Sequence, residues 1–128
     1  KPKEDLRELF SRLVFDMVVL NSRDIPENIW FYRHEGGWRL CPISYGLSKP
    51  SSLPFRTLQT AVVGKNTVAD TNTALSVARY FNLSARQAKE IILTTLRVTR
   101  DWESTARFYG ALRSDCTLMQ SAFAAETV

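Results

Sequence analysis

The 128-residue chain contains only two cysteines and one histidine, and these shortages exclude several classes of protein. Cys41 and Cys116 are too few for a disulfide framework and lack the spacing of a metal motif, which favours reduced thiols in a cytoplasmic protein. Uninterrupted apolar runs reach only four residues, as at 17–20, which is far too short to span a bilayer. The charged, amphipathic N-terminus does not have the composition of a signal peptide.

The overall composition is that of one soluble, globular domain. Hydrophobic residues make up 45% and charged residues 23% of the chain, and the formal net charge is +4. This balance is typical of a folded protein, and the length suits one domain with a buried core. The basic residues are scattered, so the charge permits contact with nucleic acid or an acidic partner without requiring it.

The hydrophobic pattern predicts a helix over about residues 3–20. Pro2 suits the start of this helix, and Asn21 is predicted to end it because asparagine tolerates the left-handed conformation. The apolar residues recur at steps of three and one, which places them on one helix face: Leu6, Leu9, Phe10, Leu13, Val14, Met17 and Val18.

A small β-hairpin is predicted next. Residues 29–33 and 38–41 are short and rich in aromatic side chains, and the glycines of Glu35-Gly36-Gly37 suit a tight turn between them. Residues 44–57 contain several prolines and serines and are predicted to be irregular, and residues 58–63 are predicted to be extended.

The second half of the chain predicts helices. Asp70 is placed to cap a helix over 71–81 that ends at Asn82, and Ser84 and Gln87 match a capping box. One long helix is predicted from there to Gly110, roughly 37 Å in length at about 1.5 Å per residue. The face that this helix is predicted to bury carries Ala88, Ile91, Ile92, Thr95, Val98, Thr99, Trp102 and Ala106.

A final helix is predicted to begin with Ser114 as its cap. This helix is expected to bury Leu118, Met119, Ala122 and Phe123. The predicted fold class is therefore mainly α, with one small β-hairpin.

At the level of motifs the chain resembles the HipA family of serine/threonine kinases, the toxins of bacterial toxin–antitoxin pairs. The likeness rests on the segments ELFSRLVFDMVVLN, GGWRLCP, ALSVARYFNLSARQAKEII, RDWESTARFYG and MQSAF. It implies that residues 1–128 form a helical subdomain like a kinase C-terminal lobe, and that this subdomain is part of a longer protein. In such a lobe a helix delivers the catalytic loop and a hairpin carries the metal site.

The resemblance assigns roles to individual residues of the loop. The family pattern N-T-D-D-H-x-x-N-H-G-F aligns its first Asn with Asn21 and its magnesium-binding Asn with Asn28. The position of the catalytic Asp, however, is Arg23. The second metal-binding Asp, in the pattern W-R-L-x-P-x-Y-D, falls on Tyr45, or on Gly46 if one residue is inserted.

These replacements remove the chemistry of the kinase. An arginine stays protonated and cannot accept the proton of a substrate hydroxyl, and magnesium prefers carboxylate oxygens to the single neutral carbonyl of Asn28. Asp24 becomes the base only in an alternative register with a shorter loop, and the second metal ligand is then still missing. Losing such a carboxylate costs on the order of 10³-fold in rate.

Asn28 and Asp24 also have simpler interpretations. An asparagine after a proline-containing loop bonds nearby backbone, and Asp24 before Pro26 stabilises a turn. His34 near the hairpin tip is expected to be solvated. Trp30, Trp38 and Trp102 are expected to pack in the core or on the hairpin.

The functional expectation is a pseudokinase or degenerate toxin lobe that binds a protein partner and needs no cofactor. The resemblance makes a helix-turn-helix antitoxin the first partner to test, and any contact with DNA is then indirect. One alternative is the C-terminal lobe of an active HipA-type kinase, which would use Mg-ATP. Another is a small basic module that contacts DNA directly, for which binding must weaken steeply with salt.

Overall fold

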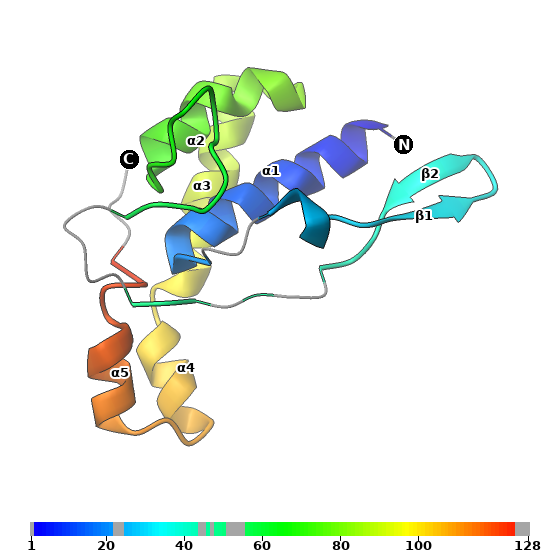
Figure 1. Ribbon diagram of the computed structural model, residues 1–128. Helices are drawn as coiled ribbons and strands as arrows, with labels where there is room; N and C mark the ends of the chain where they lie inside the picture. The colour runs from blue at the N-terminus through cyan, green and yellow to red at the C-terminus, as the bar shows by residue number, and fades with distance from the viewer. Residues whose placement is uncertain (1, 22–24, 44–45, 47, 51–55, 125–128) are drawn as a thin grey trace.

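The computed structural model describes residues 2–21, 25–43, 46, 48–50 and 56–124. Its architecture is mainly helical with one two-stranded antiparallel hairpin, which confirms the predicted fold class (Figure 1). The elements in chain order are α1 (Pro2–Val19), the 3₁₀ turn η1 (Pro26–Asn28), β1 (Phe31–His34), β2 (Gly37–Leu40), α2 (Thr71–Val77), the 3₁₀ turn η2 (Ala78–Phe81), α3 (Ala85–Thr99), α4 (Trp102–Phe108) and α5 (Arg113–Met119).

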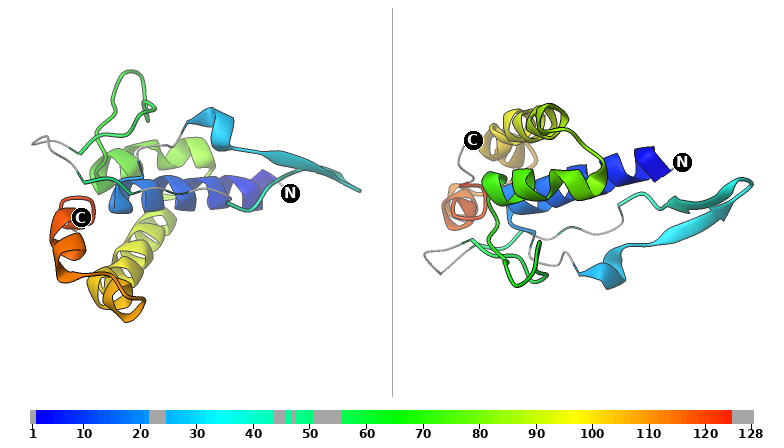
Figure 2. Two further views of the ribbon diagram at one scale, coloured as in Figure 1. Left: turned by 60° about the horizontal axis from the view of Figure 1, so that its bottom comes forward. Right: turned by 90° about the horizontal axis from the view of Figure 1, so that it is seen from above.

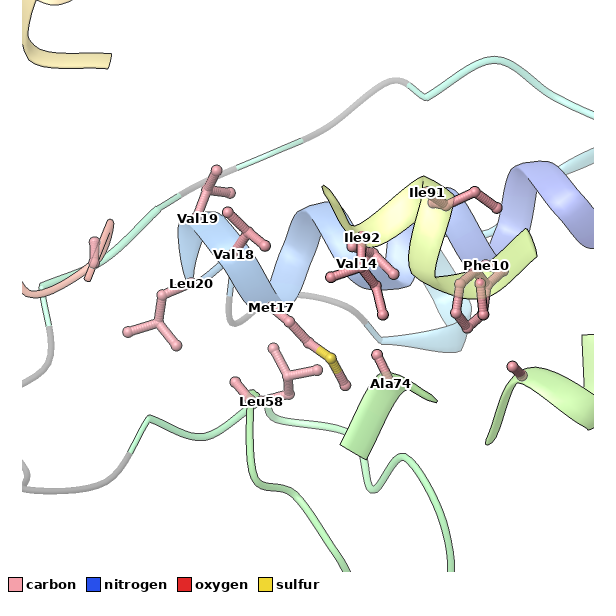
Figure 3. Packing of buried hydrophobic residues seen from close by; sticks show 14 residues of the cluster. Phe10, Val14, Met17, Val18, Val19, Leu20, Leu58, Ala74, Ile91 and Ile92 are labelled. Atoms are coloured by element: carbon pink, nitrogen blue, oxygen red, sulfur yellow. The ribbon is translucent and has the colours of Figure 1, made fainter. Parts of the chain in front are cut away.

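Helix α1 is the centre of the molecule, and α2, η2 and α3 pack against it (Figures 1 and 2). Its buried face matches the predicted apolar stripe from Phe10 onward. In the core, the side chain of Met17 points toward Leu58 and Ala74 (Figure 3). The ring of Phe10, which is fully buried, meets Phe81 edge-on at a centroid distance of 5.4 Å. These contacts join the N-terminal helix to the middle of the chain.

The end of α1 differs from the prediction by one residue. Leu20, not Asn21, adopts the left-handed conformation, with φ of 51°. The backbone N–H of Asn21 donates to the carbonyl of Asp16 at 2.8 Å, which is the six-to-one bond of a Schellman closure. Leu20 is only 4% exposed, so burial of its side chain offsets the cost of the left-handed backbone.

The predicted caps in the middle of the chain are confirmed. The carboxylate of Asp70 accepts a hydrogen bond from the N–H of Thr73 at 2.6 Å. Ser84 and Gln87 exchange both bonds of a capping box, at 3.2 and 2.9 Å. Asn82 ends the preceding turn in the left-handed conformation, with φ of 55°. Local chemistry alone determines these boundaries.

The prediction of one long helix ending at Gly110 is wrong. The helix breaks at Arg100 and Asp101, and α4 sets off in a new direction beside α5 (Figure 1). On α4 the ring of Trp102 stacks on Phe123 with centroids 4.3 Å apart. This stacking joins two residues that are distant in sequence. Val98, predicted to be buried, is consequently 73% exposed.

The final helix also begins differently from the prediction. Ser114 lies inside α5, and the carboxylate of Asp115 accepts a hydrogen bond from the N–H of Leu112 at 2.9 Å. The predicted core residue Leu118 is 66% exposed, while Cys116 is buried. Helix α5 therefore buries a different face from the predicted one, and the thiol of Cys116 lies in the protein interior.

Arg56 links residues 121–122 to the C-terminal end of α1 through hydrogen bonds. Its guanidinium donates to the carbonyls of Ser121 and Ala122 at 2.6 and 2.7 Å, and to those of Met17 and Val18 at 2.6 and 3.0 Å. The last carbonyls of a helix lack partners within the helix, so a cation there satisfies them and complements the helix dipole. Burial lowers the pKa of Arg56, yet an arginine remains charged at neutral pH.

Beyond the helices, the hairpin has the predicted location. Strands β1 and β2 pair with Phe31 opposite Leu40 and Arg33 opposite Trp38. Gly37 has a φ of 128°, which an L side chain rarely adopts. Residues 58–63, predicted to be extended, contribute only an isolated bridge between Val63 and Asn66. Across the described part of the chain, no helix is long and apolar enough to cross a membrane.

Candidate functional site

The loop that follows α1 starts from a buried asparagine. Asn21 is 3% exposed, and its side-chain N–H donates to Oδ1 of Asp16 at 2.8 Å. Together with the Schellman bond to the carbonyl of Asp16, this contact fixes the direction in which the chain leaves the helix. Asn21 therefore holds the C-terminal end of α1, directly before the segment predicted to be a catalytic loop.

Asn28 lies at the end of η1 and is exposed. Its backbone N–H donates to the carbonyl of Ile25 at 2.9 Å, which holds the 3₁₀ turn. The structure brings Asn28 and Asn21 to the same pocket. Arg23, Asp24 and Tyr45 lie outside the described residues, so the position of the base in either register stays a prediction.

The pocket that Asn21 and Asn28 share has a volume of about 270 Å³. Helix α1 contributes Arg12 and Asp16 to it, and its walls are mostly apolar. Sequence reasoning missed Asp16, which is only 9% exposed. The available signal was a carboxylate among the apolar residues at the end of α1, where a charge needs a partner to be buried.

The described residues do not complete a magnesium site. Asp16 is the one carboxylate among the described residues that line the pocket, and its Oδ1 accepts a hydrogen bond from the amide of Asn21. No group of three or more His, Cys, Asp or Glu side chains is placed to hold a metal ion within the described ranges.

The hairpin carries a concentration of exposed aromatic side chains. Trp30 and Trp38 are each 64% exposed, and Phe31 is 51% exposed. Trp30 and Trp38 therefore do not pack in the core, which was one of the two predicted locations, whereas Trp102 is packed against Phe123. The hairpin extends away from the helical body (Figure 2), which leaves these side chains with little to pack against. We call Phe31 and Trp38, which the pairing register places on one face of the hairpin, the aromatic hairpin surface; Tyr32 lies on the opposite face.

Charged contacts attach the base of the hairpin to α1. Arg39 pairs with Asp5 at 3.2 Å and with Glu4 at 3.4 Å, and the hydrogen bond to Asp5 raises the pKa of the arginine. From the helix side, Arg12 donates to the carbonyl of Cys41 at 2.6 Å. These bonds orient the hairpin, so its exposed side chains are presented by an anchored element.

A second exposed apolar group lies at the turn between α4 and α5. Phe108 and Tyr109 are 83% and 82% exposed, and Leu112 is 66% exposed.

On the hairpin, His34 is exposed, and its ring lies 6.3 Å from that of Tyr32. Both cysteines are free thiols, Cys41 partly and Cys116 fully buried.

Comparison with known proteins adds no relatives to this description. No protein-family model matches the chain, and no curated protein or solved structure does so either. The interpretation of the site therefore depends on its own residues and geometry.

Proposed function

We propose that the chain is a HipA-like C-terminal kinase subdomain without its catalytic carboxylates, and that it acts in the cytoplasm by binding a protein partner. Arg23 replaces the base, and Tyr45 or Gly46 replaces the second metal ligand. The fold supports the proposal because a helix leads into the Asn21 loop and a hairpin follows it directly. This order of elements is the one that the resemblance implies.

The observation that carries the proposal is the aromatic hairpin surface. Soluble proteins seldom expose a contiguous apolar patch unless it binds something. Tryptophan, tyrosine and arginine are enriched among the residues that supply most of the binding energy in protein interfaces. The aromatic residues bury a large area with few rotatable bonds, and arginine adds a charged group with five hydrogen-bond donors. Trp38 lies directly opposite Arg33 on the hairpin, which combines both kinds of side chain on one face.

A helix-turn-helix antitoxin is the proposed partner, following the family resemblance. The test measures, by isothermal titration calorimetry, binding of the chain to helix-turn-helix antitoxins of the HipA type. Trp38→Ser should weaken binding at least about tenfold, equivalent to about 1.4 kcal/mol. Phe108→Ser is the control, since Phe108 is an even more exposed aromatic residue on a different element. Unchanged affinity in Trp38→Ser, or an equal loss in Phe108→Ser, contradicts the proposed surface.

Direct binding of single-stranded nucleic acid is a second candidate, favoured by the placement of Arg33 beside Trp38. Bases stack on aromatic side chains while arginines contact the backbone, and such binding weakens steeply with salt. Fluorescence anisotropy with a labelled oligonucleotide at low and high salt separates this candidate from the first. No binding at low salt eliminates it.

A further inference from the structure

The pocket beside α1 is a hollow enclosed by segments that lie far apart in the sequence. Its volume of about 270 Å³ is at the small end of the range for ligand pockets, roughly 300 to 1,000 Å³. Its apolar walls come from α1, from both sides of η1, from the chain after β2, from residues 61–62 and from η2, and they include Leu13, Ile25, Ile29, Ile43, Val62 and Phe81. The shape therefore suits a compact ligand.

Two large apolar side chains of the pocket are open to solvent. Ile29 is 40% exposed and Ile43 is 53% exposed, and both line the hollow. Exposed apolar side chains that surround a concave space mark a binding site more strongly than single ones on a convex surface. A ligand in the pocket covers them and releases the water beside them, which favours binding of an apolar body.

The charged groups at the pocket are already paired within the protein. The Nε of Arg12 donates to Glu8 at 2.9 Å, and its Nη2 donates to the carbonyl of Cys41 at 2.6 Å. Oδ1 of Asp16 accepts from the amide of Asn21 at 2.8 Å, and Asp16 has a further interaction besides. Neither charge therefore needs a counter-charge from a ligand.

The uncharged polar groups of the pocket are engaged in the same way. Asn28 and Thr60 each have an interaction partner. The backbone N–H groups of Asn28 and Ile29 donate to the carbonyls of Ile25 and Pro26 at 2.9 and 3.0 Å. A charged ligand would have to leave water for an apolar space whose described charges are already paired, and that desolvation is costly.

We propose that this pocket binds a compact, uncharged, apolar molecule about the size of two fused rings. Apolar cavities of roughly 150 Å³ take up benzene, and the larger volume of about 270 Å³ accommodates a larger body. The ligand packs against Leu13, Val62 and Phe81 and lies under Ile29 and Ile43. The inference concerns a different surface from the aromatic hairpin surface and is independent of the proposed function.

Two-dimensional NMR of the full chain titrated with 3-methylindole tests the proposal. Saturable shifts of the Ile29 and Val62 amide signals are expected, with a Kd at or below about 1 mM. Two charged relatives should bind at least about tenfold more weakly: indole-3-acetate, which is an anion, and tryptamine, which is a cation. The absence of saturable shifts up to about 3 mM overturns the proposal, and so does equal affinity for either charged relative.

Variants at the pocket wall locate the bound molecule. Ala61 is exposed and lines the pocket, so Ala61→Phe should occlude it and weaken binding of 3-methylindole at least about tenfold without disturbing the core. Ala85→Phe is the matched control, because Ala85 is exposed and does not line the pocket. A loss of affinity in Ala85→Phe as large as that in Ala61→Phe overturns the site.

A second pair of variants removes apolar wall instead of filling the space. Ile29→Ser should weaken binding of 3-methylindole at least about threefold, because part of the apolar contact is lost. Leu93→Ser should leave the affinity unchanged, since Leu93 is 51% exposed and does not line the pocket. Full affinity in both Ala61→Phe and Ile29→Ser overturns the site, as does an equal loss in Ile29→Ser and Leu93→Ser.

Discussion

Replacing Arg56 by methionine tests how the two ends of the fold are held together. Methionine keeps most of the apolar stem and removes the guanidinium, which binds two carbonyls at the end of α1 and two in the segment after α5. Hydrogen bonds to a charged group contribute about 1.5 to 3 kcal/mol each in favourable cases. The structure therefore makes Arg56 a link between elements distant in sequence.

The four bonds do not add independently. They share one cation, and water reaches part of the site once the side chain is shortened, so we expect a total loss of about 3 kcal/mol in the free energy of unfolding. For a domain of this length that loss lowers the melting temperature by on the order of 10 °C. The stability of Arg56→Lys should lie between those of the parent chain and Arg56→Met. An ammonium group lacks the planar geometry with which a guanidinium reaches both pairs of carbonyls.

Urea denaturation followed by circular dichroism measures this loss. Arg86→Met is the control: Arg86 is exposed on the first turn of α3, and its replacement should change stability by less than about 0.5 kcal/mol. Hydrogen exchange adds a local signature, with faster exchange expected at the end of α1 and after α5 in Arg56→Met. A stability within about 0.5 kcal/mol of the parent chain would refute the structural role given to Arg56.

Three further substitutions test separate parts of the fold. Phe10→Ala should destabilise the chain by about 3 to 5 kcal/mol in urea denaturation, because it empties a fully buried site against Phe81; a loss below about 1 kcal/mol contradicts the core as described. Asp70→Ala should cost about 1 kcal/mol through the lost cap of α2, and an unchanged denaturation midpoint argues against that bond. Gly37→Ala should speed amide exchange in the hairpin, because Gly37 has a positive φ that alanine rarely adopts. Gly36→Ala is the control and should leave exchange unchanged, because Gly36 has no positive φ and an added Cβ meets open space.

The parts of the fold that could be predicted from sequence depend on local chemistry. The apolar stripe of α1, the cap at Asp70 and the capping box at Ser84 each involve residues within a few positions of one another. Propensity and periodicity report such interactions directly. Helix α1 and the first residues of α2 and α3 appear in the structure within one residue of the predicted bounds.

The parts that could not be predicted depend on distant contacts. After the break that follows Thr99, Trp102 stacks on Phe123, and no pattern within the helix indicates that pair. The exposure of Trp30 and Trp38 follows from the hairpin extending beyond the body, which composition cannot show. The role of Arg56 likewise appears only when four carbonyls from two segments converge.

Part of the candidate site could likewise be predicted from the sequence, and part of it could not. The family resemblance singled out Asn21 and Asn28, and both line one pocket in the structure, while their roles stay a prediction. Asp16 and Arg12 could not be predicted as site residues. They line the pocket together with residues more than ten positions further along the chain, and only the structure shows this. A buried carboxylate on an apolar helix face is the sequence signal that would have identified Asp16.

Phosphotransfer is the most direct test of the central claim that the kinase-like frame has lost its catalysis. The measurement is autophosphorylation with radiolabelled ATP and magnesium, together with calorimetric titration of Mg-ATP, on the longest natural form of the protein. The account predicts no transfer above background, unchanged by Asp24→Asn, while binding of the helix-turn-helix partner still depends on Trp38. Robust transfer that disappears in Asp24→Asn would contradict it.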